Sequence, residues 1–440
     1  MSRQVLLVHD GRDVRSWGDR SSSLALGQQI RRFTDFESIG RRTVQTPVAV
    51  GPFVGGVRDS KYGERVIRHL LDPKGGLAQQ LLLRSLAIAG VHADFVTTNP
   101  MESVDRFLRA ARSDSELQQI FGLFEHAHGI IVNGLGSMVF RYPRRRDLDY
   151  LLFALALAVR MKKPAYLVNA LASDCPWSGT IPEVEAAVYS TLEQATGVMV
   201  RDPMSQQRLE ALGLHGVSMV PDAAFTWGTV YREIIEKDNA GCLNECFEPW
   251  PESHAAFRQD RWPREYVLVT GASVHPGLDV SHWPNFFESI ISRVKDETGL
   301  QVVVAGSGED FLASVAERTQ SIYIREDIPI ALALNILANA RAMLSGRFHP
   351  SVLASLGGVP CTFLECSAHK TFSLQLQLLY QDPRVFTIED SSENLELISD
   401  DLVRKVHAPM EVRASIRSAS LTLGVQAEAG LSSMLSSLTS

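Results

Sequence analysis

The sequence lacks three features that would assign it to a familiar class: a positive net charge, a long apolar run and a dense set of cysteines. Its 43 lysine and arginine residues are outnumbered by 50 acidic residues, giving a net charge of −7, so no global positive field exists to attract nucleic acid. The longest apolar stretch, residues 150–159, is about half as long as a bilayer requires. The N-terminal apolar run ends at His9, too early for the core of a signal peptide. We therefore expect a cytoplasmic protein without a membrane span, for which peripheral membrane association stays open.

The cysteines are too few for a disulfide framework. There are five, at Cys175, Cys242, Cys246, Cys361 and Cys366. Their spacing lacks the C-x-x-C pattern and the accompanying histidines of a structural zinc site. We expect free thiols and no metal.

What the sequence does have is a repeated alternation of short Val- and Ile-rich runs with longer helical patterns, over 440 residues. This alternation indicates βαβ units and parallel sheets, and the length suits two domains. The expected strands are residues 4–9, 129–132, 165–169, 198–201 and 217–220, then 266–270, 301–305, 321–324, 342–345 and 359–364. The prediction is an α/β protein with two Rossmann-like, doubly wound domains facing a cleft, a GT-B-like arrangement.

The expected domains follow from where this alternation stops and restarts. The N-terminal domain covers residues 1–228, with an excursion at about 40–78, and a linker without clear periodicity covers 229–262. The C-terminal domain covers 263–430, and the serine-rich residues 431–440 are expected to be a flexible tail. Doubly wound sheets bind ligands beyond the carboxyl ends of their strands, so the interdomain cleft is the expected site.

The main functional candidates follow the expected strand at 342–345. Gly346, Arg347 and His349 come next, and Pro350 suits the first turn of a helix. Because a helix N-terminus favours an anion, Arg347 could hold a phosphate or carboxylate and His349 could transfer a proton. Pro350 also favours an extended backbone at His349. The alternative is structural: an arginine that caps a strand and a histidine bonded to a backbone carbonyl.

Further candidates lie in the first half of the chain. Asp19 could orient a hydroxyl group or cap a helix that begins near Ser21. Gly134, Gly136 and Ser137 could bring backbone N–H groups to a phosphate, although a tight turn explains them equally well.

Arginines supply the remaining candidates. Arg201 could bind an anion, or form an ion pair with Asp202 or Asp222 at the domain edge. The chain has one dense basic run, and its members are either a solvated surface or a contact for a pyrophosphate or an anionic membrane. They are Arg141, Arg144, Arg145 and Arg146.

In their order along the chain, these motifs resemble the polysaccharide pyruvyltransferase family. Residues 346–349, followed by a helix of small residues, look like its Arg-Leu-His element. Residues 17–19 resemble its Gly-Asp loop, and residues 133–137 resemble its Asn-Gly-Glu-Gly segment. Residues 200–205 and 220–222 resemble its Arg-Asp-x-x-Ser and Pro-Asp pair.

The resemblance implies a transferase of polysaccharide or exopolysaccharide biosynthesis. It would move a pyruvyl group from phosphoenolpyruvate, as co-substrate and without a cofactor, to hydroxyls of a sugar, nucleotide sugar or lipid-linked saccharide, forming a pyruvate ketal. The implied catalytic residues are His349 and Asp19. The resemblance implies that the second domain and Arg201 bind the donor, and that the first domain binds the acceptor. The donor residues are Arg347, Arg201 and Gly346; the acceptor-side residues are Gly134, Gly136, Ser137 and Asp222.

Two departures from the family pattern bear on the acceptor. Leu135 stands where the family often has a carboxylate, and residues 170–172 replace a more glycine-rich loop. Two alternatives stay open. One is a GT-B-type glycosyltransferase that uses a nucleotide sugar, because the same architecture can use an arginine or histidine at this helix terminus to hold a nucleotide diphosphate. The other, which Leu135 keeps open, is a noncatalytic family member that binds a phosphorylated ligand.

Overall fold

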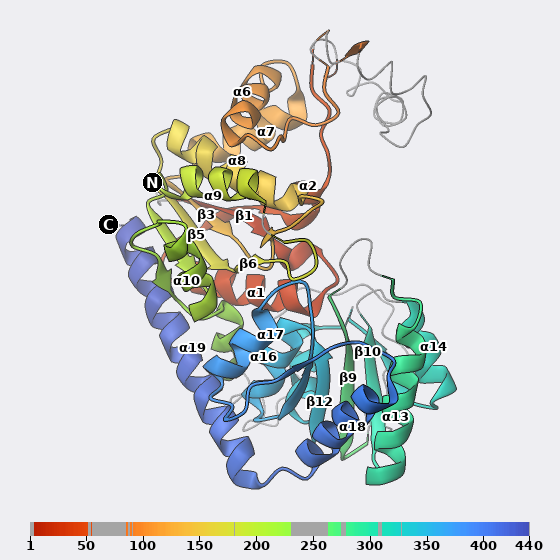
Figure 1. Ribbon diagram of the computed structural model, residues 1–440. Coiled ribbons are helices and arrows are strands. Elements are labelled where there is room, and N and C mark those ends of the chain that lie inside the picture. The colour runs from red at the N-terminus through yellow and green to blue at the C-terminus, as the bar shows by residue number, and fades with distance from the viewer. Residues whose placement is uncertain are drawn as a thin grey trace.

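The computed structural model describes most of the chain and shows two α/β domains (Figure 1). The described residues are 4–51, 54, 85, 86, 89, 91–179, 181–229, 263–273, 279–306, 310–326 and 328–439. The expected linker lies outside them except for Thr229, as does most of the expected excursion. Each domain is built on a parallel sheet, as the sequence predicts, and within the described residues each sheet has six strands.

The first sheet has the strand order β2-β1-β3-β5-β7-β8. Its strands are β1 (Val5–Asp10), β2 (Phe36–Gly40), β3 (Gly129–Asn133), β5 (Ala165–Ala170), β7 (Gly197–Val200) and β8 (Ser218–Met219). β1, β3 and β5 are buried along their whole length, because helices cover both faces of the sheet. Along β1, Val5 and Leu7 face α1 (Trp17–Arg31), whereas Leu6 and Val8 pack with α8 (Arg146–Arg160).

The remaining elements of this domain surround the sheet. The helices are α2 (Arg41–Gln45), α6 (Pro100–Ala110), α7 (Ser115–His126), α9 (Pro182–Leu192) and α10 (Pro203–Ala211), with short 3₁₀ turns η1 (Gly11–Asp13) and η2 (Ala223–Thr226). A small separate sheet pairs β4 (Met138–Phe140) with β6 (Ala172–Asp174).

The second sheet has the order β11-β10-β9-β12-β13-β14. Its strands are β9 (Tyr266–Ala272), β10 (Gln301–Gly306), β11 (Ile322–Arg325), β12 (Ala342–Gly346), β13 (Cys361–Leu364) and β14 (Val385–Phe386). One face is covered by α13 (Trp283–Thr298), α14 (Asp310–Arg318) and α18 (Ser392–Val406). The other is covered by α15 (Ile330–Ala338) and α16 (Phe348–Leu356), and α17 (Lys370–Gln377) follows β13.

One apolar cluster joins the two domains. It includes Val5 and Trp17 from the first domain together with Leu268 and Leu353 from the second. Because α1 packs against α15 and α16, the carboxyl ends of the two sheets are held facing each other.

The last helix corrects the expected domain end and tail. α19 (Met410–Thr439) runs from the second domain back along the first, ending near the N-terminus (Figure 1). Leu431 and Leu435 are fully buried, so the expectation of a flexible tail at 431–440 is wrong. Between the serines, four apolar residues recur at helical spacing and form a buried stripe. They are Leu431, Met434, Leu435 and Leu438.

We expect Leu435→Ala to lower the free energy of unfolding by about 2–5 kcal/mol, because it leaves a cavity under α19. Ser436→Ala, on the exposed face of the same turn, is the control and should change little. Denaturant unfolding checks both variants. Equal stabilities of the two variants would contradict the packing of this helix end.

Two further observations concern membranes and thiols. No helix in the described part of the chain is long and apolar enough to cross a membrane. Cys175, Cys361 and Cys366 are buried as free thiols, whereas Cys242 and Cys246 lie outside the described residues.

Candidate functional site

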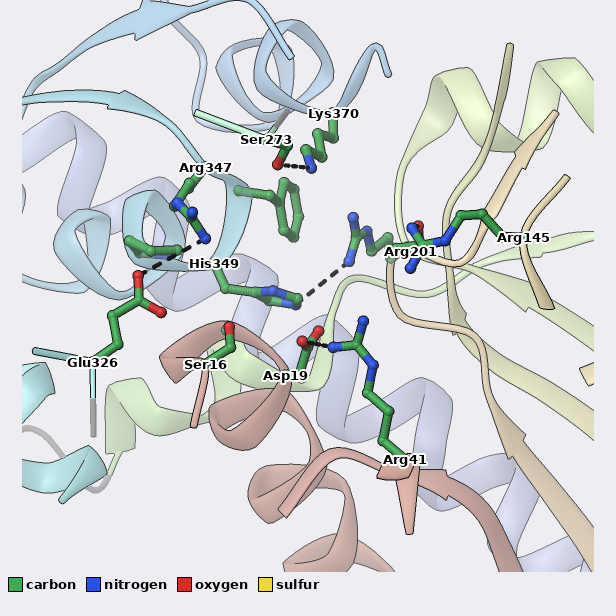
Figure 2. Close-up of a pocket in the computed structure, with 14 residues that line it drawn as sticks. Ser16, Asp19, Arg41, Arg145, Arg201, Ser273, Glu326, Arg347, His349 and Lys370 are labelled. Atoms are coloured by element: carbon green, nitrogen blue, oxygen red, sulfur yellow. Dashed lines mark hydrogen bonds and ion pairs between the residues drawn. The ribbon is translucent and has the colours of Figure 1, made fainter. Parts of the chain in front are cut away.

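A cavity of about 200 Å³ lies between the domains, beyond the carboxyl ends of their strands (Figure 2). Both domains line it. The first contributes Ser16, Gly18, Asp19, Arg41, Gly136, Arg145 and Arg201, and the second contributes Ser273, Glu326, Arg347, Phe348, His349, Pro350 and Lys370. Five of the predicted site residues are thus brought together, namely Asp19, Gly136, Arg201, Arg347 and His349.

His349 lines the cavity and is held from two sides. Its Nε2 is 3.1 Å from Oδ2 of Asp222 in the first domain. On its other side the ring rests on Gly18, where an added Cβ would lie 2.6 Å from His349 Nδ1. A glycine at the start of α1 therefore makes room for the imidazole.

The backbone at His349 differs from expectation. Arg347 is the extended N-cap residue of α16, and His349 already belongs to the first helical turn. The expected extended conformation before Pro350 is therefore wrong. Pro350 fits within this first turn because its missing N–H would have no partner there in any case.

The pKa values of His349 and Asp222 are shifted by burial and by each other. Burial lowers the pKa of His349, and the Asp222 carboxylate partly opposes this. Burial also works against ionisation of Asp222, but the nearby charges of His349 and Arg201 outweigh it and lower the pKa of that carboxyl. Asp222 is thus a buried anion that orients the imidazole, and it does not itself line the cavity.

Arg201 joins this pair from the end of β7. Its Nη1 is 3.3 Å from Asp222 Oδ2 and 3.4 Å from His349 Nε2. The guanidinium carbon lies 3.9 Å from the centre of the Phe348 ring, a cation–π contact. The expected ion pair with Asp222 forms, and Arg201 lines the cavity as well.

Asp202 has a separate role. It accepts hydrogen bonds at the N-terminus of α10 and pairs with His369 of the second domain, with 3.0 Å between Oδ1 and Nε2. His369 is not one of the described residues that line the cavity.

Arg347 and Gly346 occupy the end of β12. Burial lowers the pKa of Arg347 to about 10, which leaves the guanidinium charged at neutral pH. Gly346 does not line the cavity: an added Cβ would lie 2.4 Å from the Ala272 Cβ, so this glycine lets β12 pass close to β9.

On the first domain's side, Asp19 forms an ion pair with Arg41 and is not the cap of α1, whose N-cap is Ser16. Gly136 lines the cavity, and its carbonyl accepts a hydrogen bond from Arg145 Nη1 at 3.3 Å.

Gly134 and Ser137 pack on the side of the Gly136 loop away from the cavity. Neither is among the described residues that line it. Ser137 donates to Asp147 at 2.9 Å, and an added Cβ at Gly134 would lie 2.6 Å from the Ala170 Cβ. Leu135, the departure from the family pattern, is fully buried and does not line the cavity either.

Comparison with known proteins gives the family. The model of the family described as polysaccharide pyruvyl transferase matches residues 81–367. The chain belongs to this family. No curated protein sequence matches it.

Solved structures show what this family member resembles in fold. It is similar to a UDP-GlcNAc 2-epimerase from Neisseria meningitidis solved with UDP-GlcNAc, at 14% identity and a TM-score of 0.56, over 98% of this chain and 100% of that one. A variant of Os79 from O. sativa solved with UDP is also similar, at 13% identity and a TM-score of 0.54, over 99% and 100% of the chains. At these identities the likeness shows only the two-domain GT-B fold. The transferase class follows from the family.

Several residues of the pyruvyl transferase cavity were not predicted. Lys370 begins α17 and donates to Ser273 Oγ at 2.8 Å, and burial lowers its pKa to about 8. Arg41 directly follows β2, a strand that the sequence pattern did not reveal. Glu326 follows β11, and burial raises its pKa to about 8.

The basic run at 141–146 divides into separate roles. Arg145 alone among its described members lines the cavity, and it holds Asp147 with two nitrogens. Arg144 pairs with Asp149, and Arg146 pairs with Asp94. The arginines of this run therefore mainly form ion pairs within the first domain, and Arg145 also faces the cavity.

The cavity lining is strongly cationic. Among the described residues, five basic side chains line it against two carboxyl groups, those of Asp19 and Glu326. With a pKa of about 8, Glu326 is largely neutral at pH 7, so five positive charges face one negative charge. This excess suits a small ligand that carries several negative charges. The basic side chains are Arg41, Arg145, Arg201, Arg347 and Lys370.

Proposed function

We propose that the protein transfers a pyruvyl group from phosphoenolpyruvate to two hydroxyl groups of a saccharide, forming a pyruvate ketal. The observation that carries the proposal is the cationic interdomain cavity, which a carboxylate-held histidine also lines. Phosphoenolpyruvate has a carboxylate and a phosphate, so it needs two cationic contacts and a group that moves protons.

The donor is assigned to the second domain's side of the cavity. Arg347 and Lys370 stand on that side, and Arg201 reaches His349 from the first domain (Figure 2). We assign the donor's two anionic groups to these three cations. Their charge stabilises the phosphate as it leaves.

The acceptor is assigned to the first domain's side. Asp19, Arg41, Gly136 and Arg145 form this wall. Asp19 orients a hydroxyl group, and the two arginines fix its carboxylate and the loop at Gly136. Of the predicted acceptor residues, Gly134, Ser137 and Asp222 then act by shaping the site.

The function is tested by incubation with phosphoenolpyruvate and a panel of free, nucleotide-linked and lipid-linked sugars. Phosphate release with a mass gain of the acceptor is the expected result. Calorimetry with UDP tests the glycosyltransferase alternative, for which UDP and not phosphoenolpyruvate should bind. Failure of phosphoenolpyruvate both to bind and to release phosphate with every acceptor would refute the proposal.

For the donor contact, we expect Arg347→Lys to weaken phosphoenolpyruvate binding about tenfold, which corresponds to the loss of one charged hydrogen bond. Lysine keeps the charge but loses the planar fork that holds two oxygens. Calorimetric titration measures the affinity. Arg318→Lys, at an exposed ion pair with Glu288, is the control. An unchanged affinity in Arg347→Lys would remove Arg347 from the donor site.

A further inference from the structure

Glu326 is a buried carboxyl group on the cavity wall that takes no part in the proposed donor and acceptor contacts. Its side chain is 2% exposed, and it lines the cavity beside Arg347 and Ser16 (Figure 2). Within the described part of the chain, its Oε1 makes no hydrogen bond, and the Nη1 of Arg347 lies 3.9 Å away. A buried carboxyl oxygen on a cavity wall that has one long ion-pair contact but no hydrogen bond points to a ligand.

The position of Glu326 is fixed by both domains. Its backbone N–H donates to Gly306 O at 3.0 Å, and its carbonyl accepts from Arg20 Nη2 at 3.3 Å. Its Oε2 accepts from the Trp17 backbone N–H at 3.3 Å, at the start of α1. Oε2 thus accepts a hydrogen bond from the first turn of α1, while Oε1 lies on the cavity wall.

The proposed reaction needs two proton-transferring groups. One must give a proton to the methylene carbon of the donor, and the other must take the proton of the attacking hydroxyl. His349 can serve only one of these at a time. Resting on the proposed function, we infer that Glu326 is the acid that protonates the methylene carbon, while His349 is the base for the hydroxyl.

The O–H bond of Glu326 breaks, the electron pair of the donor's C=C bond forms the new C–H bond, and the neighbouring carbon becomes positive. The first hydroxyl oxygen bonds to that carbon and passes its proton to His349. The second hydroxyl oxygen then bonds to the same carbon, the bond to the phosphate oxygen breaks, and this second proton leaves with the phosphate. Transfer of the His349 proton to Glu326 through solvent restores both groups.

The surroundings of Glu326 suit the acid form at neutral pH. Burial raises its pKa to about 8, although the Trp17 N–H and the charge of Arg20 oppose this. The other charged groups that share its cavity are Arg347, Lys370, Arg201, Arg145, Arg41 and Asp19. Burial lowers the pKa of His349, which favours the neutral imidazole, the form that can act as the base.

Two variants separate an acid from a mere helix cap. Glu326→Gln keeps the length and an oxygen for the Trp17 N–H but has no proton to give. Glu326→Asp keeps the acid but is one methylene shorter. An acid role ranks Asp above Gln in turnover, whereas a cap role ranks Gln above Asp in both turnover and stability.

The experiment measures phosphate release, phosphoenolpyruvate affinity by calorimetry and the melting temperature of each variant. We expect Glu326→Gln to bind phosphoenolpyruvate as the wild type does and to lose turnover about 10²-fold, with Glu326→Asp retaining more. Glu365→Gln is the matched control, because its carboxyl also accepts a backbone N–H, that of Ile388 at 2.9 Å, outside the cavity.

Full turnover in Glu326→Gln, or turnover in Glu326→Asp no higher than in Glu326→Gln, would overturn the inference. A wild type that binds phosphoenolpyruvate and releases phosphate, with Glu326→Gln equally active, would leave the proposed function standing and remove only this role of Glu326. A wild type that neither binds phosphoenolpyruvate nor releases phosphate from it would overturn both.

Discussion

His349→Gln is expected to keep the fold and phosphoenolpyruvate binding but to lose turnover by about 10²–10⁴-fold, the usual contribution of a positioned acid or base. Glutamine has nearly the reach of histidine, and its amide can donate to Asp222 in place of the imidazole. It does not titrate, so it cannot take a proton from a hydroxyl group. The buried contacts of the ring with Asp222 and Gly18 are therefore largely kept while the chemistry is lost.

The second domain offers a matched control for this variant. His369 also pairs with a buried carboxylate of the first domain, Asp202, but does not line the cavity among the described residues. His369→Gln should therefore keep turnover near that of the wild type. Phosphate release and thermal unfolding measure both variants. Full turnover in His349→Gln, or an equal loss in the control, would show that the imidazole only bridges the domains.

The sequence predicts the sheets well because most of their central strands are buried on both faces. All ten expected strands occur in the structure within a few residues of their expected bounds. β2 was missed because only one of its five residues is buried, so this edge strand carries no hydrophobic pattern. With β2 missed, Arg41 at the start of the next helix had no reason to be placed at the carboxyl edge of the sheet.

Site residues were predictable where they follow a strand directly. Arg201 and Arg347 are the first residues after β7 and β12, and His349 lies in the following turn. Glu326 also follows a strand, β11, but it was not predicted, because it stands between Arg325 and Asp327 in what reads as an exposed charged turn. Its side chain and carbonyl contact Trp17 and Arg20 of α1 in the other domain, and local patterns do not encode these contacts.

Gly134, Gly346 and Asp222 are predicted site residues that have supporting positions beside the cavity. Gly134 and Gly346 are needed for close approach between neighbouring strands and loops, and neither is among the described lining residues. Asp222 follows β8 as a ligand-binding residue would, but its carboxylate turns toward two side chains, His349 and Arg201. Spacing places a residue at the site, whereas only packing decides whether its side chain faces the ligand.

Asp222→Asn should therefore affect turnover and stability together. Asparagine keeps the shape but removes the negative charge that holds His349 at 3.1 Å and Arg201 at 3.3 Å. Arg201 is 1% exposed, and leaving such a cation without its buried counter-charge costs roughly 3–5 kcal/mol of the free energy of unfolding. With the imidazole no longer oriented, we expect turnover to fall about 10²–10⁴-fold.

The stability of this variant should also depend differently on pH. Because the pKa of Asp222 is lowered in the folded state, its carboxylate stabilises the wild type fully above the unfolded pKa of about 3.9 and less as the pH falls through the folded value. Asp222→Asn lacks this contribution, so its stability should fall less steeply than that of the wild type below about pH 4. Denaturant unfolding at several pH values measures the difference.

Asp202→Asn provides the control that separates the two effects. Asp202 is equally buried and also has a lowered pKa, because contacts with His369 and Ser205 outweigh the effect of burial. Its loss should destabilise the domain contact and change the acid dependence, but it should spare turnover, since His369 does not line the cavity among the described residues. If Asp222→Asn were destabilised yet turned over like Asp202→Asn, Asp222 would hold the domains together without orienting His349 for proton transfer.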